Sequence, residues 1–207
     1  MPSALRSFHS LRGTRFQRAP CKGVSDMRLL WVFALLMIGA CCSAYADSEI
    51  PRFAKVDKPI EGSCYIKQIP ASIAGGIENH LVIAYRILLD GSDEMLWRSS
   101  GWYAHEVFLT SDCKYLIRMG NWSRGQEPSA EDLAVAFYVD GELLKAYSTV
   151  ELIQDKESVD RSIGHYLWQS QDTDYPYLKG WGETFYLKTI EDKVFEFNFK
   201  TGEIKNH

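Results

Sequence analysis

Runs of basic residues are missing from the chain after Ala46. Residues 1–46 hold six of the 23 Lys and Arg residues but only one of the 27 Asp and Glu residues, so the remainder has a formal net charge of −9. Nucleic acids and anionic membrane surfaces are bound by concentrated Lys and Arg side chains. The charge therefore argues against both as partners of the folded part.

Catalytic and metal-binding signatures are missing as well. The chain has no G-x-S-x-G nucleophile elbow, and the glycines at 75–76 lack the context of a phosphate-binding loop. The histidines after residue 46 stand at 80, 105, 165 and 207, and none is paired at a spacing such as H-x-H or H-x-x-x-H. We predict no metal site and no cofactor. His105 and His165 are the best candidates for an acid–base role.

The strongest positive signal lies near the amino terminus. A basic residue precedes the apolar run LLWVFALLMIGA, and Ala44-Tyr45-Ala46 supplies the small residues that signal peptidase accepts. We predict a signal peptide over residues 27–46, which makes the product periplasmic or secreted. Two alternatives stay open. One is an uncleaved anchor, and the other is a lipoprotein held at the membrane through Cys41, which ends a sequence similar to a bacterial lipobox.

The remaining boundaries follow from composition. Residues 1–26 are rich in Arg and Ser, and they fit either a mitochondrial transit peptide or an upstream extension with Met27 as the true start. Neither interpretation makes them part of the fold. Residues 47–62 are polar and contain two prolines, so we predict a loosely ordered lead-in. Residues 63–207 are expected to form a single domain.

Only two of the five cysteines follow the predicted cleavage point, Cys64 and Cys113. An even number of cysteines in an oxidising compartment favours a disulfide. Two buried free thiols are the alternative, because a free cysteine is often simply a small core residue. A bond between them would tie the first expected strand to the turn of the central hairpin.

That central hairpin lies within residues 96–122. Two runs of alternating apolar residues, 107–109 and 115–119, flank the turn-prone residues 110–113. A short helix is expected near 149–155, capped by Thr149, and a polar loop over 169–182. Further strands are expected at residues 64–69, 80–89, 95–97, 133–139, 142–147, 162–168, 185–190 and 194–199. This series predicts an antiparallel all-β domain, built as a meander that forms a sandwich or a small propeller.

Two segments resemble β-propeller blades. VFLTSDCKYLIRMG is similar to the S-x-D-G-x-Y turn of such blades, and VFEFNFKTGEI resembles quinoprotein-type repeats, which end F-D-x-x-T-G-x-[IL]. Cys113 stands where the blade pattern has glycine, Asn198 stands where it has aspartate, and no unit repeats at a constant period. The span from Cys64 to Ile204 also resembles small exported bacterial proteins built from such units. The resemblance implies a propeller-like fold but no quinone cofactor.

Aromatic side chains are abundant, at 13% of residues. Eight of them tend to stand at expected strand ends or in loops: Trp97, Trp102, Tyr103, Trp122, Trp168, Tyr175, Tyr177 and Trp181. Such rings can form a stacking platform for a sugar or an apolar ligand, and Trp102 and Trp122 are the candidates. The alternative is core packing, which is the outcome that we expect for both.

These observations predict an exported binding or interaction module of the bacterial periplasm or envelope. Its partner would be an unknown protein or a small carbohydrate-like ligand, with membrane attachment only if Cys41 is lipidated. Two other functions stay open. One is an envelope hydrolase that uses His105 or His165, and the other is a structural partner in an envelope protein complex.

Overall fold

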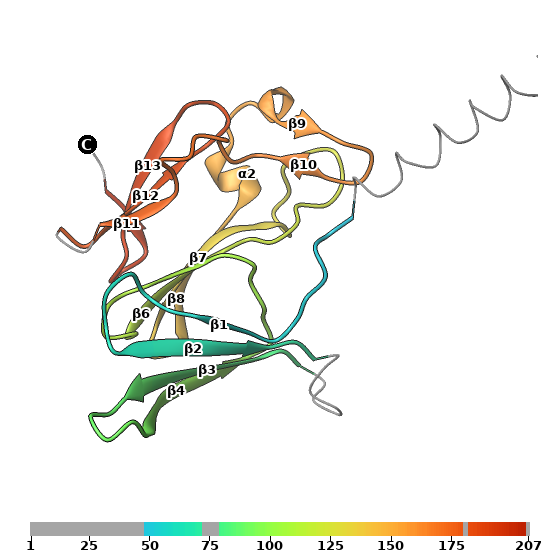
Figure 1. Cartoon of the computed structure of the whole chain (residues 1–207). Coiled ribbons are helices and arrows are strands. Elements are labelled where there is room, and N and C mark those ends of the chain that lie inside the picture. The colour runs from blue at the N-terminus through green and yellow to red at the C-terminus, as the bar shows by residue number, and fades with distance from the viewer. Residues whose placement is uncertain (1–47, 72–78, 180–181, 206–207) are drawn as a thin grey trace, which may run out of the picture. The chain divides into compact units, whose positions relative to one another are not determined.

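A computed structural model describes residues 48–71, 79–179 and 182–205 (Figure 1). The predicted signal peptide, the segment before it, Cys41, Trp181 and His207 lie outside these residues. In the described ranges, no helix has both the length and the apolar character needed to cross a membrane. Contacts divide the chain after Ala46, and all the described residues belong to the unit from Asp47 to His207.

The first sheet is an antiparallel meander. Its second strand alternates buried and half-buried residues along its whole length, as the sequence predicts. One prediction is wrong here. Residues 55–57 were expected in a loosely ordered lead-in, but they form the first strand and pair with residues 66–68. In sheet order the strands are β1 (Lys55–Asp57), β2 (Cys64–Ile69), β3 (Leu81–Ile87) and β4 (Asp93–Ser100).

The second sheet contains the central hairpin and the hairpin that follows it. Asp140 and Gly141 have φ values of 48° and 81°. Positive φ at both central residues is what a type I′ turn requires, and glycine adopts it without steric cost. Both hairpins lie where the sequence predicts them. The strands in sheet order are β5 (Val107–Leu109), β6 (Tyr115–Met119), β7 (Leu133–Val139) and β8 (Glu142–Ser148).

The third sheet closes the chain. Phe195, Phe197 and Phe199 are all buried, in agreement with the alternation in the sequence. The strands in sheet order are β11 (Tyr177–Lys179), β12 (Thr184–Lys188), β13 (Val194–Asn198) and β14 (Glu203–Ile204). One prediction is wrong here, because β11 lies in the expected loop 169–182.

Between the second and third sheets the chain forms short elements. These are α2 (Thr149–Leu152), the 3₁₀ helix η2 (Lys156–Ser158) and a small hairpin of β9 (Asp160–Arg161) and β10 (Tyr166–Leu167). The single strand predicted over 162–168 is therefore wrong, because the chain turns back between β9 and β10. The predicted helix exists, but its N-cap is Ser148 rather than Thr149.

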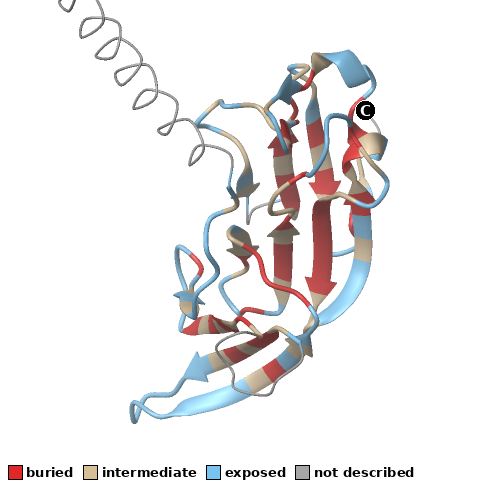
Figure 2. Ribbon diagram, turned by 90° about the vertical axis from the view of Figure 1, so that its right-hand side faces the viewer, coloured by how far each residue is buried: buried red, intermediate tan, exposed pale blue. Residues whose placement is uncertain are grey.

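The middle sheet contributes to two hydrophobic clusters. Val135 and Phe137 of β7 pack with aromatic residues of the third sheet, such as Phe197. Ala136 and Tyr138 of the same strand pack with residues of the first sheet and with Trp102. Because successive side chains of a strand point to opposite faces, β7 covers both clusters at once. Figure 2 shows the buried residues concentrated along the long strands, which is the arrangement of an all-β sandwich.

Cys64 and Cys113 form a disulfide, with their Cα atoms 6.0 Å apart and a sequence separation of 49. The bond joins the start of β2 to the turn between β5 and β6. Cys113 has a φ of 54°, so it adopts the left-handed conformation that glycine favours. Cys113 is thus both the predicted disulfide partner of Cys64 and the residue that stands at this turn in place of glycine.

Candidate functional site

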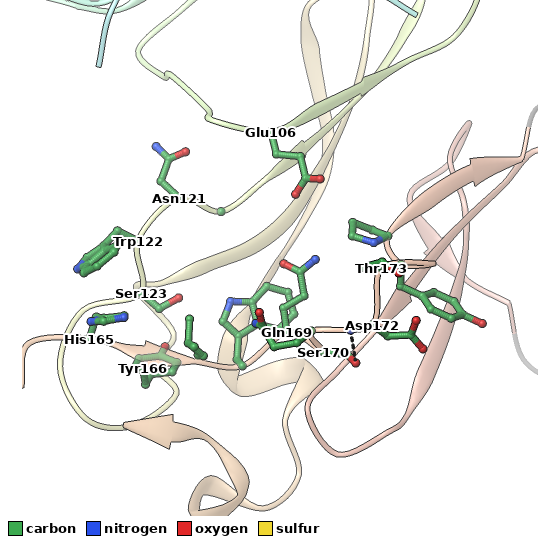
Figure 3. Close-up of a pocket in the computed structure, with 16 residues that line it drawn as sticks. Glu106, Asn121, Trp122, Ser123, His165, Tyr166, Gln169, Ser170, Asp172 and Thr173 are labelled. Carbon is green, nitrogen blue, oxygen red and sulfur yellow. Dashed lines mark hydrogen bonds between the residues drawn. The ribbon is translucent and has the colours of Figure 1, made fainter. Parts of the chain in front are cut away.

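A pocket with a volume of about 330 Å³ lies beside the end of β6 (Figure 3). Its walls come from three parts of the chain: Glu106 before β5, residues 120–123 after β6, and residues 165–176 around and beyond β10. Gly120 allows one of these segments to pass close to β7, because a Cβ atom there would lie 1.7 Å from the carbonyl oxygen of Leu133. The sequence separates these parts by as many as 70 residues, and the fold brings them together.

One side of the pocket is a stacked pair, Trp122 and His165. Their ring centroids are 3.9 Å apart and their planes are inclined by 30° (Figure 3). Backbone pairing holds the two segments in register, since Tyr166 donates its N–H to the carbonyl of Ser123 at 3.2 Å. Trp122 is half-buried, so part of its indole faces the pocket while His165 fixes its orientation.

Glu106 contributes a carboxylate that points into the pocket, toward Gln169 (Figure 3). Burial raises the pKa of this carboxyl, and the positive charge of Lys55 partly offsets that effect. Within the described ranges, no side chain or backbone group donates a hydrogen bond to the Glu106 carboxylate. This oxygen pair is therefore available to a ligand.

A buried network supports the pocket from beneath. The hydroxyl of Tyr166 donates to the carboxylate of Asp132 at 2.8 Å and lies 2.6 Å from the hydroxyl of Thr149. Burial is the main cause of the raised pKa of Tyr166. Thr149 is fully buried and its hydroxyl is engaged in this network. The preceding Ser148 is therefore the N-cap of α2. Trp168, next along the chain from β10, is also buried and lines the pocket.

The far rim of the pocket is polar and ordered by hydrogen bonds. Asp172 accepts hydrogen bonds from the N–H of Asp174 and from the amine of Lys188, both at 3.1 Å, and these bonds lower its pKa. The N–H of Asp172 donates to the hydroxyl of Ser170 at 3.2 Å, the bond drawn in Figure 3. Tyr175 completes this rim near Lys188. The rim thus presents a carboxylate, hydroxyls and an aromatic ring around one opening.

The structure separates the two tryptophan candidates. Trp102 is 5% exposed and belongs to the core cluster between the first and middle sheets. Its indole N–H donates to the hydroxyl of Ser99 at 3.1 Å, and its ring packs against Tyr138. Trp122 lines the pocket. The sequence patterns around the two tryptophans are similar, so they did not reveal that Trp102 lies in the core and Trp122 in the pocket wall.

The two histidine candidates are separated as well. His165 lines the pocket beneath Trp122, whereas His105 is not among the residues that line it. The ring of His105 lies edge-on to Tyr103, and its Nε2 atom is 3.8 Å from the carboxylate of Glu49. Burial lowers the pKa of His105. No group of three or more metal-ligating side chains occurs in residues 48–71, 79–179 and 182–205.

Sequence reasoning did not identify Glu106, Gln169 or Asp172 as site residues. Each is a common polar residue in a segment without a motif, so its only distinction is its place in the fold. The aromatic residues were a better guide, because Trp122, Trp168 and Tyr175 all line the pocket.

Comparisons of the chain with protein-family models, with curated proteins and with solved structures gave no match. The function must therefore be argued from the geometry of the site.

Proposed function

We propose that this domain is an exported binding module whose pocket holds a short carbohydrate-like ligand. The observation that carries the proposal is the combination of an indole surface and a carboxylate without a described donor in one pocket, with Trp122 on one side and Glu106 on the other. Its volume of about 330 Å³ is near the lower end of the range of about 300–1,000 Å³ for small-molecule sites.

The chemistry of the lining supports a sugar over a purely apolar ligand. A sugar ring has apolar C–H faces that stack on an indole, and its hydroxyls need donors and acceptors around the edge. The pocket supplies both kinds of contact, since two tryptophans alternate with the carboxylates, amides and hydroxyls of Glu106, Gln169, Ser170 and Asp172. The carboxylate of Glu106 accepts no hydrogen bond from the described residues, so a ligand hydroxyl that donates to it would gain affinity and orientation.

The compartment enters the proposal through the leader and the disulfide. Disulfides form and persist in oxidising compartments such as the periplasm or the extracellular space. The bond between Cys64 and Cys113 and the predicted signal peptide both fit export. Attachment to a membrane through Cys41 is the alternative route to the same side of the envelope.

The test is a thermal-shift screen of the exported protein against neutral oligosaccharides and peptidoglycan fragments. A ligand at 100 times its dissociation constant adds about 2.7 kcal/mol to the free energy of unfolding. For a domain of this size, that corresponds to a rise in Tm of about 5–10 °C. Trp122→Ala should abolish the shift. The control is Tyr85→Ala, which removes a partly exposed ring that stacks on Tyr65 and does not line the pocket.

Two outcomes would contradict the proposal: no saccharide shifts Tm, or Trp122→Ala binds as tightly as the natural protein. Recovery of the exported protein with a stoichiometric protein partner, without any saccharide binding, would instead support the structural-partner alternative.

A hydrolase is the second candidate, and one observation favours it. Glu106 and Asp172 line the same pocket, and their environments shift their pKa values in opposite directions, raised for Glu106 and lowered for Asp172. Glycosidases use such a pair, in which the group with the raised pKa acts as the general acid. Release of reducing ends from a bound oligosaccharide, lost in Glu106→Gln, would establish this activity. Binding without any turnover would exclude it.

A further inference from the structure

A second hollow of about 160 Å³ adjoins the pocket and shares Asn121, Trp122 and Ser123 with it. Unlike the pocket, it is lined by arginines, Arg52, Arg118 and Arg124. A ligand that occupies the pocket can therefore reach these guanidinium groups across the shared wall.

The carboxylate of Glu49 lies in this hollow. It accepts hydrogen bonds from Arg52 at 2.6 and 3.1 Å, and its other oxygen is 3.5 Å from Arg124. Burial by itself would raise the pKa of Glu49, but the hydrogen bond and charge of Arg52, together with the charges of His105 and Arg124, lower it. The chain itself thus supplies an anionic partner to Arg52 and Arg124 in this hollow.

The cationic groups around Glu49 retain donor capacity that it does not use. The guanidinium of Arg118 lies 5.2 Å from the centre of the Trp102 ring, and one terminal nitrogen donates to Tyr138 at 3.4 Å. Among the described residues, its Nε atom is buried without a hydrogen-bond partner, so the chain itself does not satisfy every donor of Arg118.

Charge balance supports the same conclusion. Besides the three arginines, the lining holds three carboxylates, those of Glu49, Glu131 and Asp132. Asp132 is already engaged as an acceptor for Tyr166. When Glu49 leaves, the hollow has one positive charge in excess. Residues 48–54 form no helix or strand, and Ile50 and Phe53 in that segment are exposed, so Glu49 can withdraw without breaking a sheet.

We propose that this second hollow is a subsite for an anionic group of the ligand, and that the Glu49 carboxylate occupies it until the ligand displaces it. The inference rests on the proposed saccharide-binding function and specifies the ligand as an acidic saccharide. Its sugar ring lies in the pocket beside Trp122, and its carboxylate lies among Arg52, Arg118 and Arg124. Trp102 acts as a positioning residue that holds Arg118 in place.

The experiment compares two matched probes by isothermal titration calorimetry: a glucose oligosaccharide and the same oligosaccharide with one glucuronic acid. The measured quantity is the ratio of their affinities. For the natural protein the acidic probe should bind at least about tenfold more tightly. Glu49→Gln removes the competing charge and should raise the ratio several-fold. Arg124→Gln should lower it toward one, and the Arg124 side chain is 75% exposed, so the fold tolerates the change.

Arg86→Gln is the matched control, because Arg86 is an exposed arginine on β3 that pairs with Glu94 and lies in neither hollow. It should leave the ratio unchanged. A ratio near one in the natural protein, or a ratio that neither Glu49→Gln nor Arg124→Gln alters, would overturn the inference. In that case, Trp122-dependent binding of the neutral probe would leave the proposed function standing. Binding of neither probe would count against both.

Discussion

At the scale of single residues, Trp102 and Trp122 differ in what their removal costs. Trp102→Ala should lower the free energy of unfolding by about 3–5 kcal/mol, because it deletes a large side chain from a packed core. Trp122→Ala should cost clearly less, because Trp122 is half-buried and its described ring contact is with His165. Chemical denaturation of the two variants measures both values. Equal losses in the two would show that Trp122 is a core residue rather than a pocket residue.

We predict that the Glu106 carboxyl makes the free energy of unfolding depend on pH. Its folded-state pKa is raised, so folding disfavours the ionised form, and the resulting penalty appears as pH rises from the ordinary value through the folded value. Glu106→Gln should therefore raise Tm relative to the natural protein at pH 7. The two should melt alike at a pH well below 4, where the natural side chain is protonated.

Differential scanning calorimetry at both pH values checks this expectation. Glu142→Gln, on the exposed end of β8, gives the effect of removing a carboxylate outside the pocket. A lower Tm for Glu106→Gln at pH 7 would mean that the carboxylate, through Lys55 or another group, stabilises the fold instead.

At the scale of elements, the disulfide links a strand of the first sheet to the central hairpin of the second. Its removal in a Cys64→Ser, Cys113→Ser double variant should cost about 4 kcal/mol, the chain-entropy value for a closed loop of about 50 residues. That is a large share of the 5–15 kcal/mol typical of a domain. Urea denaturation of the exported double variant and the natural protein, without reductant, measures the difference. A midpoint unchanged by the double substitution would mean that the bond does not constrain the unfolded chain.

The elements that the sequence predicted correctly are those whose signal is local. β2 coincides with a stretch of alternating burial, and β7 coincides with a continuous apolar run. Turn-prone residues bound both stretches. The strand predicted over 162–168 is wrong because a turn lies within this stretch of β-prone residues. In that turn Ser162 donates its N–H to the carbonyl of His165. Ile163, in that turn, is 89% exposed, although its residue type suggests burial.

Elements that depend on distant partners could not be predicted. β11 has only three residues and forms because β12 provides an edge to pair with. The cap of α2 depends on Glu151, whose carboxylate accepts hydrogen bonds from the backbone and the hydroxyl of Ser148, both at 2.7 Å. By local sequence alone, Thr149 is an equally suitable cap. In the folded protein, however, its hydroxyl forms a hydrogen bond with the hydroxyl of Tyr166. The candidate pocket is a stronger case, because three separate segments assemble it.

At the scale of the whole molecule, the middle sheet is the scaffold for both hollows. β6 supplies Arg118 to the second hollow and leads directly into Gly120, which lines the pocket, and Trp122, which lines both hollows. The same strand packs Ile117 and Leu116 into opposite clusters. A buried, doubly packed strand is a rigid support, and rigid elements position binding groups more precisely than loops do.

The predicted export gives the last prediction, because the predicted cleavage point lies close to Glu49 in the sequence. Cleavage after Ala46 would make Asp47 the first residue and Glu49, whose carboxylate lines the second hollow, the third. Intact mass spectrometry of the exported protein should give the mass of residues 47–207 less two hydrogens for the disulfide. Alkylation should modify Cys64 and Cys113 only after reduction. A lipid-modified Cys41 at the amino terminus would replace secretion with membrane anchoring, and an intact leader with two free thiols would contradict export.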